Sequence, residues 1–158
     1  MRDEYGCSSR SLATIDKVDF CKPVPIPLSS LTKKCNPFVS ACWHFVEPIL
    51  EAEVADAIQN SLLLSPEKEC ENREQHIQRI AWFVVNGWND CISIDVGVPA
   101  LGCYVDWPVV DGNHRLAAAI YREDVFITSY CSGDTTTLKQ LMLDKNCKRF
   151  AAPPGRGL

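Results

Sequence analysis

The sequence lacks a long apolar run, a secretory leader and an excess of positive charge. No stretch reaches the roughly 18 consecutive apolar residues that are needed to cross a bilayer. The first residues, Met1 to Tyr5, do not have the pattern of a signal peptide. The formal net charge is -4, whereas proteins that bind duplex DNA usually present a basic face. We therefore expect a cytoplasmic protein whose contacts with nucleic acid are local, weak and without sequence readout.

Close cysteine pairs are missing as well, although cysteine itself is abundant. None of the nine cysteines forms a Cys-x-x-Cys pair, the spacing that zinc sites usually need. An odd number of cysteines without a leader peptide also argues against a disulfide framework. We expect most of the cysteines to be free thiols that pack as small apolar side chains in a reducing compartment.

No internal repeat is visible, and the size of the chain fits a single domain. Its 158 residues, of which 46% are hydrophobic, are enough to bury a substantial core. We place the domain at residues 23–150, after a polar arm at residues 1–22. The Pro-Pro-Gly-Arg-Gly sequence near the end predicts a flexible tail at residues 151–158.

Proline, glycine and hydrophobic periodicity divide the domain into short strands and helices. Proline at the first helical position predicts helices that start at Glu47-Pro48 and at Ser65-Pro66. Residues 91–96 alternate between apolar and polar side chains, which is typical of a half-buried strand. The other predicted elements are an extended segment at 23–28, a strand at 103–110, a helix at 113–122, a strand at 125–130 and a helix at about 135–144. This order predicts an α+β fold with a small sheet.

The most informative stretch is Asp111-Gly112-Asn113-His114-Arg115, which joins an apolar strand end to an alanine-rich helix. Gly112 can adopt a backbone conformation that is closed to other residues, and it lets a ligand approach closely. The free N–H groups and the positive dipole end of the helix form an anion site there, and phosphate is the usual biological anion. His114 and Arg115 lie in the first turn, where cations disfavour the helix but suit a negative ligand. The motif therefore predicts a phosphate site.

Each side chain of this motif has a functional and a structural interpretation. Asp111 is a candidate magnesium ligand or activator of water, and it is equally a candidate N-cap of the helix. Asn113 either bonds a phosphate oxygen or serves as a turn residue. His114 is a candidate phosphate donor or general acid. Arg115 offers a planar fork of donors to phosphate, or else forms a surface salt bridge with Glu123 or Asp124.

Three further polar residues are weighed in the same way. Thr135 follows Gly133-Asp134 at another predicted helix start, where its hydroxyl either helps to close the phosphate site or only caps the helix. His44 and His76 lie in helical or apolar surroundings, and we interpret both as structural residues.

Taken together, these features resemble the ParB/sulfiredoxin superfamily. The similar features are the early Pro-Val-Pro-Ile-Pro-Leu strand, Gly87-Trp88 before the strand at 92–96, the Asp-Gly-Asn-His-Arg block, and Gly133-Asp134 before the last helix. They span roughly residues 23–145, and the block is the most specific of them. The resemblance implies a ParB/sulfiredoxin-like fold, in which helices flank a small mixed sheet.

The same resemblance implies a cofactor and a set of site residues. A nucleotide, ATP, would bind with its phosphates on Gly112, Asn113, His114 and Arg115, with help from Thr135. Mg²⁺ would be held by Asp111. The catalytic residues would be Asp111, His114 and Arg115.

One departure from the superfamily narrows the function that it implies. Sulfiredoxins carry a catalytic cysteine immediately before the His-Arg pair, and here Asn113 occupies that position. Asparagine cannot form the sulfur-linked intermediate, so we do not expect sulfinic acid reduction. Chromosome-partitioning clamps carry a helix-turn-helix region and a dimerisation segment after the nucleotide fold, and we expect neither here. The resemblance that remains is to the ParB-like nuclease type and to plasmid-encoded fertility-inhibition factors.

This resemblance implies a bacterial ATP-binding hydrolase with metal-dependent DNase activity that restrains DNA transfer by type IV secretion. Its partners would be nucleotide, DNA bound weakly and non-specifically, and a secretion-system coupling protein or the transferred DNA–protein complex. It would reach the inner membrane only through such a partner. The alternative is a non-enzymatic inhibitor that docks on the coupling protein or DNA complex, with a nucleotide site that is regulatory or relict.

Overall fold

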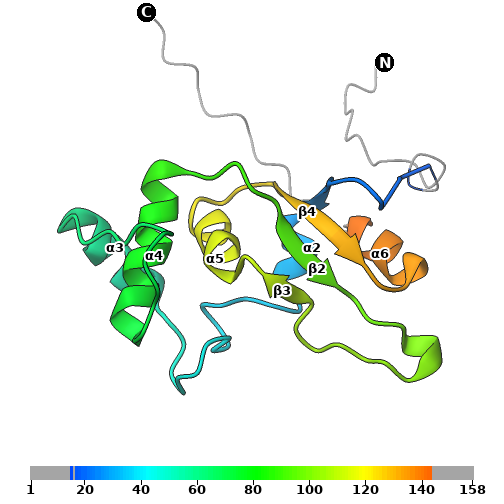
Figure 1. The fold of residues 1–158 in the computed structure, drawn as a ribbon, viewed down its shortest axis with the longest axis horizontal. Coiled ribbons are helices and arrows are strands. Elements are labelled where there is room, and N and C mark those ends of the chain that lie inside the picture. The colour runs from blue at the N-terminus through cyan, green and yellow to red at the C-terminus, as the bar shows by residue number, and fades with distance from the viewer. Residues whose placement is uncertain (1–14, 16, 144–158) are drawn as a thin grey trace, which may run out of the picture.

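A four-stranded mixed sheet organises the fold of the computed structural model, which describes residue 15 and residues 17–143 (Figure 1). The strands are β1 (Val24–Pro27), β2 (Ile92–Asp95), β3 (Val109–Asp111) and β4 (Phe126–Ser132). Their order across the sheet is β1-β4-β2-β3. β4 pairs antiparallel with β1 and parallel with β2, and β3 pairs antiparallel with β2 at the edge.

Helices surround this sheet, as the α+β prediction requires. They are α2 (Leu28–Thr32), α3 (Glu51–Gln59), α4 (Arg73–Asn86), α5 (Asn113–Tyr121) and α6 (Thr135–Met142), together with the 3-10 turn η1 (Pro99–Leu101). In Figure 1, α5 lies between the sheet and the pair α3 and α4, whereas α6 lies on the other side of the sheet strands. Within the described residues, no helix is both long and apolar enough to cross a membrane.

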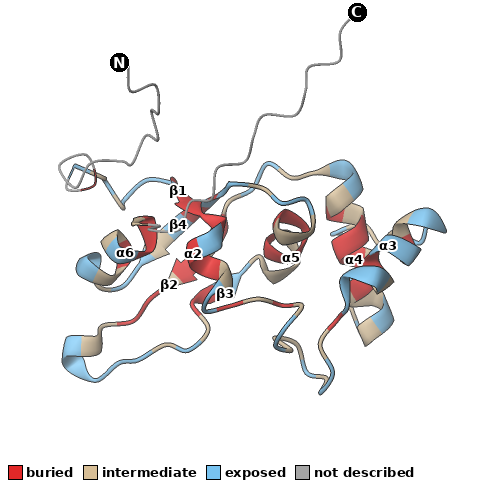
Figure 2. Ribbon diagram, turned by 180° about the vertical axis from the view of Figure 1, so that it is seen from behind, coloured by how far each residue is buried: buried red, intermediate tan, exposed pale blue. Residues whose placement is uncertain are grey.

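Two apolar clusters form the core, and α5 contributes to both of them (Figure 2). Leu116 and Ala119 of α5 pack with the sheet, α2 and α6 in the first cluster. Ala117 and Ala118 pack with α3 and α4 in the second cluster. Because these alanines are small, α4 and α5 can lie close together. All four residues are fully buried, so α5 joins the two halves of the protein.

Both predicted proline-started helices begin later than the sequence analysis expects. The second one begins at Arg73 rather than at Ser65-Pro66, because the Asn72 side chain caps it by accepting from the Gln75 N–H at 3.0 Å. The first begins at Glu51 instead of at Glu47-Pro48. There the Glu53 carboxylate accepts from the Leu50 N–H at 2.8 Å.

The predicted strand at residues 103–110 is also largely wrong, because only Val109–Asp111 pairs as β3. Pro108 cannot donate to a ladder, and its carbonyl instead accepts from the Asp95 N–H at 2.8 Å. The segment between β2 and β3 contains η1 and an isolated bridge between Val98 and Cys103. A long loop therefore joins β2 to the short strand β3.

Local residues also set two other helix ends. Gly87 follows α4 with a φ of 71°, and Asp134, rather than Thr135, caps α6 by accepting from the Thr137 N–H at 2.8 Å. The predicted strands at 91–96 and 125–130 and the helix at 113–122 match β2, β4 and α5 within one or two residues. The predicted arm at 1–22 lies mostly outside the described residues, and the tail at 151–158 lies wholly outside them.

The seven described cysteines are free thiols, but most of them are not core residues. Among these seven, only Cys35 is buried, and burial raises the pKa of its thiol to about 11. Cys21 and Cys103 are exposed. The expectation that the cysteines pack as small apolar side chains therefore fails for these two.

Gly112 is a position where a side chain should be poorly tolerated. Its φ is 96°, and an added Cβ would lie 2.5 Å from the Ile92 Cγ2 atom. We expect Gly112→Ala to lower the free energy of unfolding by about 2–4 kcal/mol, through backbone strain and overpacking together. The measurement is urea denaturation followed by circular dichroism.

Gly102→Ala is the matched control for this prediction. Gly102 also has a positive φ, 77°, but an added Cβ would meet no atom within 4 Å. We expect it to cost only about 1–2 kcal/mol, the strain of a left-handed alanine. Equal losses for the two variants would show that the contact with Ile92 does not restrict position 112.

Candidate functional site

The Asp111–Arg115 motif forms the junction between β3 and α5. Asp111 ends β3 opposite Ser93, and Gly112 follows in the left-handed conformation as the N-cap residue of α5. Among the described residues, no side chain caps this helix, and the first N–H bonded within it is that of Leu116, to the Gly112 carbonyl at 2.8 Å. The N–H groups before Leu116 therefore have no acceptor within the helix.

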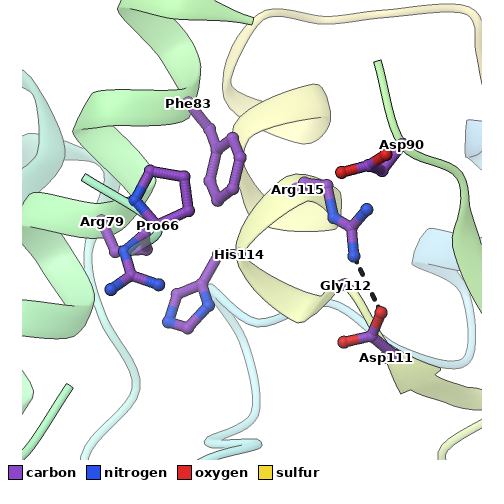
Figure 3. Close-up of a pocket in the computed structure, with 8 residues that line it drawn as sticks. All are labelled: Pro66, Arg79, Phe83, Asp90, Asp111, Gly112, His114 and Arg115. Carbon is purple, nitrogen blue, oxygen red and sulfur yellow. Dashed lines mark hydrogen bonds and ion pairs between the residues drawn. The ribbon is translucent and has the colours of Figure 1, made fainter. Parts of the chain in front are cut away.

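A cavity of about 220 Å³ opens beside this junction (Figure 3). Its walls come from α4, from the segments before α4 and β2, and from the junction itself. The lining residues are Pro66, Arg79, Phe83, Asp90, Asp111, Gly112, His114 and Arg115. The structure thus brings together four of the five motif residues, as predicted, and adds side chains from distant parts of the chain.

Arg115 is held rigidly in the cavity wall. Its guanidinium donates to the Asp111 Oδ2 atom at 2.8 Å and to the Cys91 carbonyl at 3.0 Å. Only 13% of the Arg115 side chain is exposed, against 71% for Asp111. Asp111 is therefore the partner of Arg115 and does not cap the helix. Asp124, one of the two predicted salt-bridge partners of Arg115, pairs with Arg122 instead.

Arg79 is a second cationic wall residue, and the sequence analysis did not single it out. It lies on α4 and is almost fully buried. Its guanidinium donates to the Leu64 carbonyl at 3.1 Å and to the Lys68 carbonyl. The available signal was its place between Ile77 and Ile80 on the apolar face of a helix, where an arginine needs buried acceptors.

His114 is neutral at pH 7 and packs among aromatic rings. Burial, reinforced by the nearby His76, Arg79 and Arg115, lowers the pKa of His114 to about 3. Its ring stacks on Trp43 with the centroids 4.9 Å apart. It therefore carries no positive charge for a phosphate and is not a charged proton donor near neutral pH.

His114 also contacts His76, which was interpreted as structural. The His114 Nε2 and His76 Nδ1 atoms lie 2.8 Å apart, and Cys70 approaches the same place. One ligand atom from each of these three residues lies within 4.8 Å of the other two. This group was missed because zinc sites were sought as close cysteine pairs, and its members come from distant positions in the sequence.

Two predicted binding residues do not present their side chains to the cavity. The Asn113 Oδ1 atom accepts from the Trp107 indole N–H at 2.8 Å, and its amide donates to the Val109 carbonyl at 3.4 Å. Asn113 therefore acts in the turn, which was one of its two interpretations. Thr135 is exposed at the start of α6, after the β4 end where Ser132 pairs with Asp95. The cavity lies by the opposite end of β2.

The two Asn113 hydrogen bonds should contribute measurably to stability. We expect Asn113→Ala to lower the free energy of unfolding by about 1–3 kcal/mol, because the half-buried Trp107 loses its acceptor. Urea denaturation followed by tryptophan fluorescence measures the change. Asn86→Ala is the control, since Asn86 donates only one exposed bond, to the Trp82 carbonyl. A loss no larger than that of the control would contradict the prediction.

No family model, no curated protein and no solved structure matches this chain.

Proposed function

We propose that this protein binds the phosphates of a nucleotide, ATP, in the cavity beside α5 and hydrolyses the nucleotide with Mg²⁺. The observation that carries the proposal is an uncapped helix N-terminus that opens on a cavity with two fixed arginines, Arg79 and Arg115. Backbone N–H groups at a helix start bind anions, and guanidinium groups match phosphate geometry. The backbone N–H groups and the guanidinium groups are held in place before the ligand arrives. This lowers the conformational entropy that is lost on binding.

The size of the cavity supports binding through phosphates rather than through the base. Pockets that enclose a whole small molecule usually measure about 300–1,000 Å³, and this one measures about 220 Å³. A phosphate chain fits such a volume, and the ribose and base would then lie across the exposed rim. We therefore expect weak discrimination between bases.

The charges around the cavity explain why a divalent cation would be needed. Arg79 and Arg115 carry two positive charges, Asp90 and Asp111 carry two negative charges, and His114 is neutral. This balance leaves no surplus positive charge for a triphosphate. Mg²⁺ prefers carboxylate and phosphate oxygens, so Asp111 would hold the ion against the phosphates. Asp90 is the second carboxylate that lines the cavity.

The catalytic roles follow from the same contacts. Arg115 would stabilise the charge that develops on the transferred phosphoryl group, because its guanidinium is fixed in the wall. Asp111 would orient water or the metal ion from the exposed side of the cavity. The neutral His114 would shape the cavity and would not act as a charged acid. Gly112 and Asn113 would contribute their backbone N–H groups.

The fold and biological role proposed here follow the resemblance noted in the sequence. A mixed sheet with a helix that starts at the Asp-Gly-Asn-His-Arg block is consistent with a ParB/sulfiredoxin-like fold. On that resemblance, we propose that the protein is a plasmid fertility-inhibition factor that acts on DNA transfer by type IV secretion. The alternative that it docks on a coupling protein without catalysis is tested by the variants below.

Removal of Arg115 should slow ATP hydrolysis more than it disturbs the fold. We expect Arg115→Ala to lower kcat by roughly 10²-fold, the effect of losing one fixed charge contact in the transition state. Arg122→Ala is the control, because Arg122 lies at the other end of α5, pairs with Asp124 and covers Trp88. It removes the same charge and should leave kcat unchanged. Phosphate release with Mg²⁺ and a nucleotide thermal-shift series provide the measurements.

Two results would decide against an ATPase. The proposal fails if the wild-type protein neither binds nor hydrolyses any nucleotide, or if Arg122→Ala is as damaging as Arg115→Ala. A folded Arg115→Ala protein that still blocks plasmid transfer in cells would support the docking alternative, because inhibition would then be independent of hydrolysis.

Cleavage of a DNA backbone is a second candidate function. Two observations favour it: the cavity has the size of a phosphate group, and the exposed carboxylate of Asp111 lines it. We expect salt-sensitive plasmid nicking with Mg²⁺ or Mn²⁺, and its loss in Asp111→Ala/Arg115→Ala. The double variant removes one charge of each sign, so the net charge stays at that of the wild type. Equal nicking by the double variant would assign the activity to a contaminating nuclease.

A further inference from the structure

A cysteine and two histidines from three separate segments meet beside the cavity. Cys70 lies in the segment before α4, His76 on α4 and His114 in the first turn of α5. One ligand atom from each residue lies within 4.8 Å of the other two, and each residue is half-buried. The fold therefore brings potential metal ligands together from positions as far apart as Cys70 and His114, 44 residues apart in the sequence.

The two imidazoles of this cluster are held in place by their neighbours. Trp43 lies against both rings, with centroid separations of 4.9 Å, and Phe45 meets the edge of the His76 ring at 5.5 Å. The two imidazole rings are stacked at 5.0 Å. Aromatic packing of this kind restricts the rotation of the ligands and keeps water from one side of them.

We propose that Cys70, His76 and His114 bind a single zinc ion. Zinc prefers thiolate and imidazole ligands, whereas Mg²⁺ prefers oxygen ligands. This site therefore differs in chemistry from the proposed magnesium site at Asp111. Three protein ligands leave one tetrahedral position for water or for a ligand atom. His114 also lines the cavity, which places the ion beside it.

The distances require only small movements to admit the ion. Two nitrogens that bind the same tetrahedral zinc lie about 3.3 Å apart, and a sulfur and a nitrogen lie about 3.5 Å apart, given the usual bond lengths. The imidazole nitrogens are 2.8 Å apart and share a hydrogen bond. The ion would replace the proton of that bond, and the two rings would move apart by about 0.5 Å. Cys70 lies outside the helices, and its thiol makes only a long contact of 3.6 Å with the Gln75 carbonyl. It can therefore move inward by on the order of 1 Å.

Nearby charge sets a limit on the affinity. Arg79, one turn beyond His76 on α4, opposes a divalent ion, but its guanidinium is directed at the carbonyls of Leu64 and Lys68. The Cys70 thiolate offsets part of this repulsion when the ion binds. His114 is shared with the cavity, but the other two ligands, Cys70 and His76, are not among the residues that line it. The zinc site can therefore be tested through Cys70 without changing the cavity wall.

Cobalt(II) is the probe for this site, because a thiolate ligand gives it a near-ultraviolet charge-transfer band and a tetrahedral site gives it strong visible bands. We expect the metal-free, reduced wild-type protein to bind one Co²⁺ with both features, and Zn²⁺ to displace it. Cys70→Ser should remove the charge-transfer band and weaken binding by at least ~10²-fold, more than is typical for a residue outside the ligand set. Cys103→Ser, which changes an exposed cysteine outside the cluster, should bind as the wild type does.

The outcomes separate this proposal from the proposed nucleotide function. A wild-type protein without a charge-transfer band, or a band that survives Cys70→Ser, would overturn the zinc site. If Cys70→Ser does not fold, as judged by circular dichroism, His76→Gln takes its place and must weaken Co²⁺ binding to the same extent. Arg115→Ala should lose ATP hydrolysis and keep the Co²⁺ bands, and Cys70→Ser should keep the thermal shift with nucleotide.

Discussion

The close approach of Gly112 to Ile92 is the constraint on which the site depends. Ile92 is fully buried at the start of β2, and β3 ends beside it. The left-handed turn at Gly112 lets the chain leave β3 and begin α5 without a side chain between the two backbones. α5 can then contribute to both apolar clusters. The same turn leaves the first N–H groups of α5 uncapped beside the cavity, so one local feature would serve both the packing and the proposed anion binding.

The two arginines that line the cavity are fixed in place by hydrogen-bond partners within the protein. Arg79 is anchored by two backbone carbonyls, and Arg115 by one carbonyl and by Asp111. Bonds from a charged donor to buried acceptors fix the guanidinium groups and reduce their repulsion. A ligand that binds there would meet donors already in position, but it would have to compete with the Asp111 carboxylate. That competition is the physical reason for expecting a cation between the ligand and Asp111.

Sequence reasoning located what is encoded locally and missed what is assembled at long range. Strand alternation placed β2, and the Asp-Gly step placed the start of α5, because each depends on neighbouring residues. The start of α4 at Asn72 was missed because Ser65-Pro66 offered a competing local start. Arg79 was not singled out and His76 was interpreted as structural, because the surroundings of both depend on carbonyls and rings from other segments. The cavity itself follows from packing between α4 and α5, which periodicity alone does not specify.

His114 connects the two sites, and its chemistry restricts what each can do. The Nε2 atom that faces His76 is the atom offered to a metal ion. An imidazole whose Nε2 atom binds zinc cannot also use that atom to bond a phosphate. Phosphate chemistry would then rest on Arg115, Asp111 and the N–H groups of α5. His114, which the motif suggested as a general acid, would under the two proposals hold a metal ion beside the cavity and would not transfer a proton.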